Sequence, residues 1–307
     1  MSAQAKAAAP RKASSLKKQA RQSYMIHYIM MSPFLLAFIL FTILPILASV
    51  VLSFTDFNMV QIPKFTGIEN YIRLLFEDDV YMISLKNTLI MALVVGPVGY
   101  ILSFVVAWLI NELGYRLRVM YTFFMYTPAL CGGAATIWTY IFSSDSKGFL
   151  NDFLQKLGLI NDPIQWLTNS KYTMTVAMVV AIWGSFGTGF LSFVSGLQSL
   201  DRTYFEAAAI DGLRNRWQEL YFVTFPQMKE FLLFGAVQSV SSAFSIAPTI
   251  TGNPSTNYST HTLVLHISDH ANVRYEMGYA SAAAVVLFLL MLVAWRLTNK
   301  LLSKVSA

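Results

Sequence analysis

Residues 85–111 read LKNTLIMALVVGPVGYILSFVVAWLIN, and the only charged side chain among them, Lys86, stands near the start. A helix of about 20 apolar residues crosses the hydrocarbon core of a bilayer, so this stretch predicts a transmembrane helix. The rest of the chain has the same character, because 55% of its 307 residues are hydrophobic and only 12% are charged. Such a composition is too apolar for a soluble domain of this size and indicates an integral membrane protein.

Five further apolar stretches have comparable lengths and complete the predicted fold. We expect an all-α membrane protein with about six transmembrane helices, at residues 28–54, 85–111, 119–142, 172–197, 231–250 and 277–295. The transmembrane domain then covers residues 28–299. It lies between a basic leader at 1–27, predicted to be disordered, and a short tail at 300–307.

The distribution of Lys and Arg predicts how these helices are oriented. Most of the 22 basic residues fall on one side of the membrane if both termini are cytoplasmic: those of the leader and the tail, with Arg116, Arg118, Arg202, Arg214, Arg216 and Lys229. Basic residues collect on the cytoplasmic side of membrane proteins, so we expect both termini inside. They flank the predicted helices instead of forming one face with interleaved aromatic side chains, which argues against nucleic acid as a partner.

The predicted helices hold no group that could couple transport to ions. No Asp, Glu, Lys, Arg or His lies inside them, apart from Lys86 at a boundary. Proton-driven and voltage-driven proteins need such groups within the membrane. The sequence also lacks the Walker A loop that cradles the phosphates of ATP, so we expect a transport subunit that is not an enzyme and is driven by a separate ATPase polypeptide.

The longest predicted cytoplasmic segment, residues 198–230, is where such an ATPase could dock. Thr203 and Glu206 have the spacing of a capping box, which predicts a helix that begins at Thr203. Gly212 suits the left-handed position that ends this helix. The helix would present an alanine face, residues 207–209, to the partner.

At these residues the chain resembles the permease subunits of ABC importers. The positions that match the cytoplasmic EAA loop of that family are Glu206, Ala207, Ala208, Gly212 and Pro226, and those that match its carbohydrate-uptake branch are Asp211, Trp217 and Gln218. Short stretches elsewhere agree, among them GIENYIRLL from Gly67 and GYASA from Gly278, whereas Leu213 and Phe225 depart from the pattern. The likeness extends from about Pro33 to the C-terminus and is greatest to the maltose-type first permease subunit.

The resemblance implies the ABC importer permease fold, with a coupling helix that contacts an ATPase through Glu206, Ala207, Ala208, Asp211 and Gly212. It implies a heterodimer with a second permease and a pair of ATP-binding subunits that hold ATP and Mg²⁺. An extracytoplasmic solute-binding protein would deliver the substrate, a sugar or oligosaccharide. No cofactor and no catalytic residue are expected on this chain, and its expected location is the bacterial plasma membrane.

Neutral polar and aromatic side chains are the candidates for a sugar path, because they can hold a sugar without burying a charge. In the resembling family the path runs along the helices on either side of the EAA loop. The candidates here are Tyr126, Trp183, Ser185, Thr188, Gln238, Ser239, Ser242 and Ser245. The competing interpretation is structural, since serine and threonine in membrane helices often bond their own backbone and Trp often lies at the membrane interface.

Two histidines in the last predicted outer loop have the spacing of metal ligands. His266 and His270 are separated by four residues, which places both on one face of a helix, and His261 and Asp269 are nearby. No third ligand is fixed by spacing. We therefore expect a solvated polar face here and no metal.

Two other functions stay open from the sequence. An ABC permease for an anion such as a glycerol phosphate would need basic residues or helix N-termini near the membrane midplane, and the predicted helices hold no such basic residue. A channel or ion-coupled carrier would function without a partner ATPase.

Overall fold

The computed structural model describes Tyr24 and residues 27–131 and 135–305. Within them the fold is all-α, as predicted, and the one β-type contact is an isolated antiparallel bridge between Thr55 and Phe65. The predicted leader lies almost entirely outside the described residues, as do the last two residues of the predicted tail.

The elements are η1 (Ile39–Ile43), α2 (Leu44–Leu52), α3 (Glu69–Ile72), η2 (Arg73–Glu77), α4 (Asp79–Asn111), α5 (Tyr115–Leu130), α6 (Ala135–Ile141), α7 (Phe149–Lys156), α8 (Ser170–Trp183), α9 (Thr188–Ser199), α10 (Arg202–Ile210), α11 (Arg216–Glu219), η3 (Leu220–Thr224), α12 (Phe225–Gln227), α13 (Lys229–Phe244), η4 (Thr249–Thr251), η5 (Thr256–Tyr258), α14 (Leu263–Asn272) and α15 (Met277–Val305).

Five helical segments of the described chain are long and apolar enough to cross a membrane. They are His27–Leu52, Asp79–Asn111, Ser170–Ser199, Lys229–Thr251 and Met277–Leu302. The segments overlap the first, second, fourth, fifth and sixth predicted helices, and the second and last extend further than predicted. The last helix in particular continues to Val305, within the range of the predicted tail.

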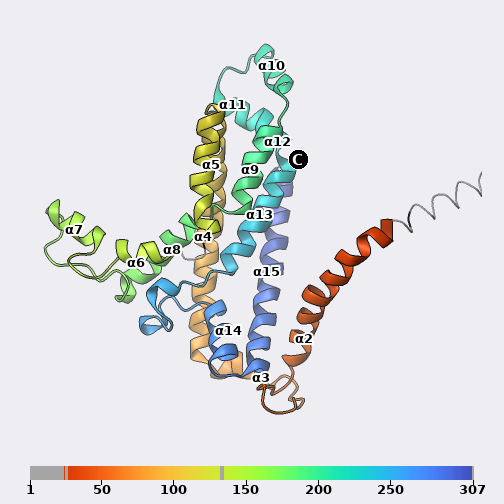
Figure 1. The fold of residues 1–307 in the computed structure, drawn as a ribbon, viewed down its shortest axis with the longest axis vertical. Coiled ribbons are helices and arrows are strands. Elements are labelled where there is room, and N and C mark those ends of the chain that lie inside the picture. The colour runs from red at the N-terminus through yellow and green to blue at the C-terminus, as the bar shows by residue number, and fades with distance from the viewer. Residues whose placement is uncertain (1–23, 25–26, 132–134, 306–307) are drawn as a thin grey trace, which may run out of the picture.

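The third predicted helix, residues 119–142, is not continuous in the structure. It is divided between α5 and α6, and each part is too short to be counted among the five long segments. Pro128 removes a backbone donor in the last turn of α5, and Cys131 then adopts an extended conformation with φ −96° and ψ 100°. Figure 1 shows that α5 stands upright beside α4, whereas α6 and α7 run off to one side. Residues 132–134, which join them, lie outside the described residues.

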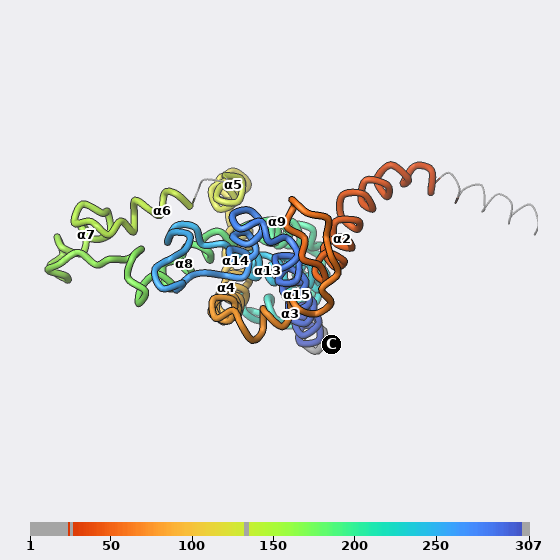
Figure 2. Tube along the Cα trace, turned by 90° about the horizontal axis from the view of Figure 1, so that it is seen from below, coloured from red at the N-terminus to blue at the C-terminus, as the bar shows by residue number. Residues whose placement is uncertain are grey.

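The centre of the molecule is a bundle of four helices. Figure 1 shows α4, α9, α13 and α15 standing side by side, and Figure 2 shows that α6 and α7 project from one flank and the first helix from the other. Helix α4 packs against α9 and α13, and α13 packs in turn against α15. The bundle therefore connects one end of the molecule, at α10, with the other end, at α3 and α14.

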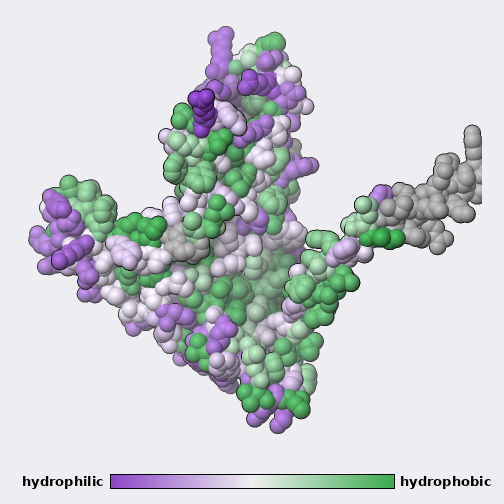
Figure 3. All heavy atoms as spheres, viewed as in Figure 1, coloured by the Kyte–Doolittle hydropathy of each residue, from purple (hydrophilic) through white to green (hydrophobic). Residues whose placement is uncertain are grey.

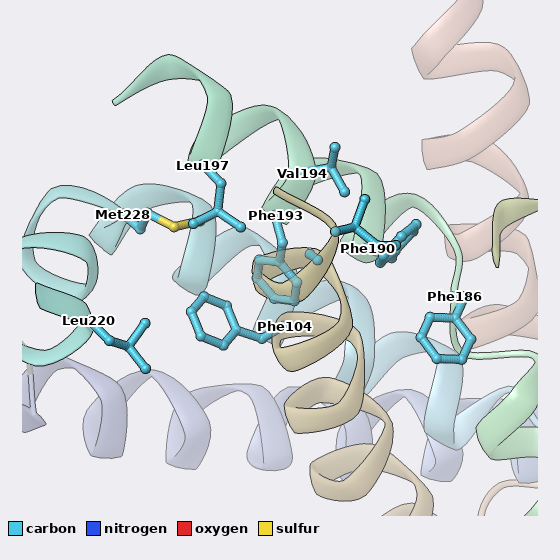
Figure 4. Close-up of a cluster of buried hydrophobic side chains, with 10 residues drawn as sticks. Phe104, Phe186, Phe190, Phe193, Val194, Leu197, Leu220 and Met228 are labelled. Carbon is cyan, nitrogen blue, oxygen red and sulfur yellow. The ribbon is translucent and has the colours of Figure 1, made fainter. Parts of the chain in front are cut away.

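A cluster of aromatic and aliphatic side chains holds α4, α9 and η3 together (Figure 4). Phe193 lies at its centre, and the rings of Tyr100 and Phe104 meet it edge-on with centroids 5.4 and 5.6 Å away. A Cβ at Gly235 would overlap the Phe193 ring, so α9 and α13 approach closely because this residue has no side chain. Lipid tails are as apolar as these side chains, so the stabilisation comes from close packing more than from exclusion of water.

The first long helix stands apart from the bundle. None of the most apolar part of His27–Leu52 is buried, and only its last section, α2, packs against α15. Figure 3 shows apolar residues along this helix and along the body of the molecule, while hydrophilic residues gather at the α10 end and at the tip formed by α7. Exposed apolar helices of this kind are suited to contact lipid or another membrane subunit.

Candidate functional site

A cavity of about 450 Å³ opens among α4, α8, α9 and α13. Its polar lining residues are Tyr100, Ser103, Ser185, Thr188, Gln238, Ser239, Ser241, Ser242 and Thr249. Apolar residues such as Val95, Ala177 and Phe190 form the rest of the wall. None of its lining residues, all within the described part of the chain, is Asp, Glu, Lys, Arg or His. The cavity can therefore receive a neutral polar molecule without burying a charge.

The break between α8 and α9 forms part of the cavity wall. Gly184 ends α8 and Gly187 precedes α9, and the residues between them lie close to α4. A Cβ at Gly99 of α4 would come within 2.8 Å of the Ser185 side chain, and Ser103 donates a hydrogen bond to the Ser185 carbonyl at 3.4 Å. A broken helix leaves backbone groups without partners in its own helix, and these groups can bind a substrate where they line a cavity.

Two hydrogen bonds fix the α13 side of the cavity. Gln238 donates from Nε2 to the Thr188 hydroxyl at 2.9 Å, which joins α13 to the beginning of α9. Ser239 donates to the Gly96 carbonyl at 2.7 Å, which joins α13 to α4. An amide side chain has two N–H donors and a carbonyl acceptor, and the bond to Thr188 uses one of these donors. The carbonyl oxygen and the second N–H of Gln238 are hydrogen-bonding groups that a ligand in this cavity can use.

The structure brings together some of the predicted path residues and not others. Those that line the cavity are Ser185, Thr188, Gln238, Ser239 and Ser242, and those that do not are Tyr126, Trp183 and Ser245. The ring of Trp183 packs edge-on against Trp138 at 5.4 Å, and Tyr126 is half-buried on α5. Ser185, Ser242 and Ser245 donate to backbone carbonyls three or four residues earlier, in α8 or α13, at 2.6 to 2.8 Å, as the structural interpretation predicts.

Sequence reasoning missed several cavity residues. Tyr100 and Ser103 come from α4, whose sequence is so uniformly apolar that two polar residues carry no distinct pattern. Their spacing of three residues places them on one face of the helix, and this spacing is the sequence feature that indicates a polar position there.

The predicted docking helix is present as α10, at the extreme end of the molecule (Figure 1). It begins one residue earlier than predicted, because the N-cap is Asp201 and not Thr203. The Asp201 carboxylate accepts a hydrogen bond from the Thr203 amide at 3.0 Å, and Thr203 already belongs to the helix. Gly212 has a φ of 94°, the left-handed conformation predicted for it, and its amide donates to the Ala209 carbonyl at 3.2 Å.

The three alanines of α10 do not share one exposed face, which corrects the predicted alanine face. Ala208 is the buried residue of this helix, which packs against η3, whereas Ala207 and Ala209 are exposed. Successive helical residues point about 100° apart, so neighbouring residues cannot all face one partner. The exposed surface of α10 also carries Tyr204 and Ile210, with Ile210 86% exposed. An exposed isoleucine beside small residues is suited to a protein contact.

The segment after α10 contacts the bundle through side chains of α11. Asn215 caps α11 by accepting a hydrogen bond from the Trp217 amide at 3.1 Å. The Trp217 ring lies 5.3 Å from Trp108 on α4, and Arg216 forms an ion pair with Glu112 at 2.9 Å. These contacts join the segment after α10 to the C-terminal end of α4, whose middle residues line the cavity.

The histidines of α14 are buried, which corrects the predicted solvated polar face. The side chains of His266 and His270 are 2% and 1% exposed, and Asp78 and Glu276 lie against them. Burial lowers the pKa of both imidazoles, so they are neutral at pH 7. Although burial opposes it, the hydrogen bond from Tyr279 lowers the pKa of Asp78, which is therefore ionised.

Comparisons with known proteins agree with these features. The family model of the binding-protein-dependent transport system inner membrane component matches residues 97–306. The chain is 31% identical over 277 residues to the probable ABC transporter permease protein YesP of Bacillus subtilis (strain 168), and the match covers 88% of each chain. It is 28% identical over 276 residues to the lactose transport system permease protein LacF of Rhizobium radiobacter, covering 87% of this chain and 90% of LacF.

A solved structure has the same fold. It is the crystal structure of a bacterial alginate ABC transporter in complex with an alginate pentasaccharide-bound periplasmic protein. One of its chains matches with a TM-score of 0.76 at 19% identity, covering 94% of this chain and 97% of that chain. The match confirms the fold predicted from the resemblance.

Proposed function

The chain belongs to the family of binding-protein-dependent transport system inner membrane components, and we propose that it is a permease subunit of an ATP-driven importer of a sugar or oligosaccharide. The observation that carries this proposal is the uncharged polar cavity inside the helical bundle. Sugars are bound by neutral hydrogen-bonding groups and apolar surfaces, and the cavity offers both. The relative LacF, which is named for lactose transport, supports the same class of substrate.

The partners proposed for the chain follow from its exposed surfaces. The exposed face of α10 is the docking surface for one of two ATP-binding subunits, which would hold ATP and Mg²⁺. The uncovered apolar helix His27–Leu52 is available to contact a second permease subunit or the bilayer. An extracytoplasmic solute-binding protein would deliver the sugar at the end of the bundle opposite α10. The alginate transporter of the same fold, whose crystal structure includes an alginate-bound periplasmic protein, supports a partner of this class.

An anionic substrate such as a glycerol phosphate is less well supported. The cavity wall has no basic side chain to balance a phosphate, and the N-terminus of α9 at Thr188 is a single weak attraction for an anion. An ion-coupled carrier would need an ionisable group in the same wall. Uptake that persists without ATP-binding subunits would favour that alternative.

Substituting Gln238 by Ala should lower the rate of sugar uptake at limiting sugar concentration by up to about tenfold, because it removes hydrogen bonds worth roughly 0.5 to 1.5 kcal/mol to a neutral ligand. Uptake of a radiolabelled panel that includes lactose and arabinooligosaccharides measures the effect. Ser245→Ala is the matched control, since Ser245 is exposed outside the cavity and donates to the Ser241 carbonyl. Normal uptake by Gln238→Ala at limiting sugar, with Ser245→Ala also normal, would place the path elsewhere.

We further propose that the chain lies in the bacterial plasma membrane with both termini and α10 on the cytoplasmic side. The C-terminal end of α15 lies at the same end of the bundle as α10 (Figure 1), and that end is rich in Arg. In a Cys131→Ser background, an impermeant maleimide should label Ile62→Cys in intact cells and Arg214→Cys only after permeabilisation. Both positions are exposed. Labelling of Arg214→Cys in intact cells would reverse the proposed orientation.

A further inference from the structure

The end of the bundle opposite α10 brings two histidines and a carboxylate together from elements far apart in the sequence. His266 and His270 lie on α14, and Asp78 is the N-cap of α4. One ligand atom from each of the three residues lies within 4.8 Å of the others. The Nε2 atoms of His266 and His270 are 3.5 Å and 3.9 Å from Asp78 Oδ2.

We propose that Asp78, His266 and His270 bind a zinc ion. The two nitrogen–oxygen separations are too long for good hydrogen bonds. Two ligand atoms that each lie 2.0 to 2.1 Å from a tetrahedral zinc ion are about 3.3 Å apart, so the His266 separation is close to this value and the His270 separation would shorten by about 0.6 Å on binding. Two imidazole nitrogens and a carboxylate oxygen are donors that zinc prefers, and three protein ligands leave a fourth position for water or another oxygen.

Neighbouring groups orient the ligands in the way that metal sites require. His270 Nδ1 lies 2.8 Å from Glu276 Oε2, and an ionised carboxylate can only accept, so Nδ1 carries the proton. The lone pair of His270 is then on Nε2, which faces Asp78. A carboxylate on the far nitrogen of a ligating histidine is the usual supporting contact in zinc sites. Asp78 is held as well, because its Oδ1 accepts from the Tyr81 amide at 2.9 Å.

The charges of the cluster favour a bound cation. Arg73 forms an ion pair with Glu276 at 3.1 Å, so these two side chains balance one another. The imidazoles that face the Asp78 carboxylate are almost fully buried, so little water reaches it from their side. A hydrogen bond from the Tyr279 hydroxyl to Asp78 Oδ2, at 2.5 Å, is a dipolar interaction and leaves the charge in place. A cation between the carboxylate and the two Nε2 atoms would compensate this charge.

The position of the site defines what the ion would do. Asp78 caps α4, the histidines belong to α14, and Glu276 directly precedes α15. A zinc ion at this point would join the ends of these three helices, where no disulfide can form because the chain has one cysteine. Asp269 lies on α14 as well but belongs to a different contact, since its carboxylate pairs with Arg274 at 3.1 Å. It therefore serves as a control within the same helix.

The test is direct measurement of zinc on the full-length chain, purified in detergent with its co-expressed partners through a tag that contains no histidine. We expect about one zinc per chain by elemental analysis. Protein stripped with a chelator should rebind Zn²⁺ alone, measured by titration calorimetry, with a rise in the midpoint of thermal unfolding. The Zn²⁺ affinity should fall about 100-fold or more in His266→Gln and in His270→Gln, and about 10-fold to 100-fold in Glu276→Gln.

Asp269→Asn should bind zinc as the wild type does. The proposal is overturned if the stripped wild-type protein does not bind Zn²⁺, or if folded His266→Gln and His270→Gln both bind it with wild-type affinity. X-ray absorption of the zinc-loaded wild type needs no variant. Two imidazole ligands in the zinc coordination shell would support the site. A coordination shell without an imidazole would overturn the proposal.

Discussion

Replacing Ala207 by Trp should prevent the ATP-binding subunits from associating with this chain while leaving the chain itself folded in the membrane. Ala207 is exposed on α10, the element at the extreme end of the molecule, and lies beside the 86% exposed Ile210. An indole at this position would hold a partner surface away from the helix. Contacts at the centre of an interface are commonly worth about 2 kcal/mol or more, so the affinity should fall roughly thirtyfold or further. Co-purification of the ATPase subunits with the tagged chain measures the loss.

Two variants separate docking from damage to the fold. Ser268→Trp makes a comparable small-to-large change at an exposed position on α14, at the opposite end of the bundle, and should leave ATPase recovery unchanged. Ala208→Trp places the indole at a buried position and should cost about 1 to 3 kcal/mol of stability, which lowers the amount of folded chain. Normal ATPase recovery and sugar-stimulated hydrolysis with Ala207→Trp would show that this face of α10 is not the docking surface.

The features that were predictable from sequence are those set by local chemistry. The apolar side chains of residues 85–111 can be kept from water only by lipid or by other protein segments. The helix at these residues therefore follows from composition and length. The left-handed turn at Gly212 was equally predictable, because a φ of 94° is accessible to glycine and strained for other residues. The resemblance at the EAA loop then identified the family, and the comparisons confirm it.

The features that were not predictable depend on contacts between distant segments. Which alanine of α10 is buried depends on the position of η3, which no local pattern encodes. The sequence does not distinguish clearly between Asp201 and Thr203 as the N-cap of α10, because either side chain can cap a helix. For the cavity, Trp183 was a reasonable candidate by residue type, yet its ring packs against Trp138 instead. Asp78, which lies against His266 and His270, directly precedes α4, so nothing in the sequence around α14 indicates that it is near these histidines.

Gly278 is the position at which a small substitution should have the largest effect on stability. It is the second residue of α15, where helix propensity alone would make Gly278→Ala stabilising by roughly 0.5 to 1 kcal/mol. The structure predicts the opposite sign. A Cβ at Gly278 would overlap the Thr55 carbonyl oxygen and come within 3.1 Å of the Phe57 amide nitrogen. The Gly278 amide also donates to the Phe57 carbonyl at 2.9 Å, so the two backbones cannot separate without losing that bond.

We therefore expect Gly278→Ala to destabilise the chain by about 3 kcal/mol, at the upper end of overpacking effects, because the obstacle is backbone and not a flexible side chain. The yield of folded chain in membranes and the thermal unfolding midpoint in detergent measure the change. Gly189→Ala is the matched control. Gly189 is likewise the second residue of its helix, α9, but its added Cβ would have no heavy atom nearer than 3.6 Å. If Gly278→Ala is as stable as Gly189→Ala, then the segment that follows the first long helix does not pack on α15 as the structure has it, and that helix is not anchored to the bundle at this point.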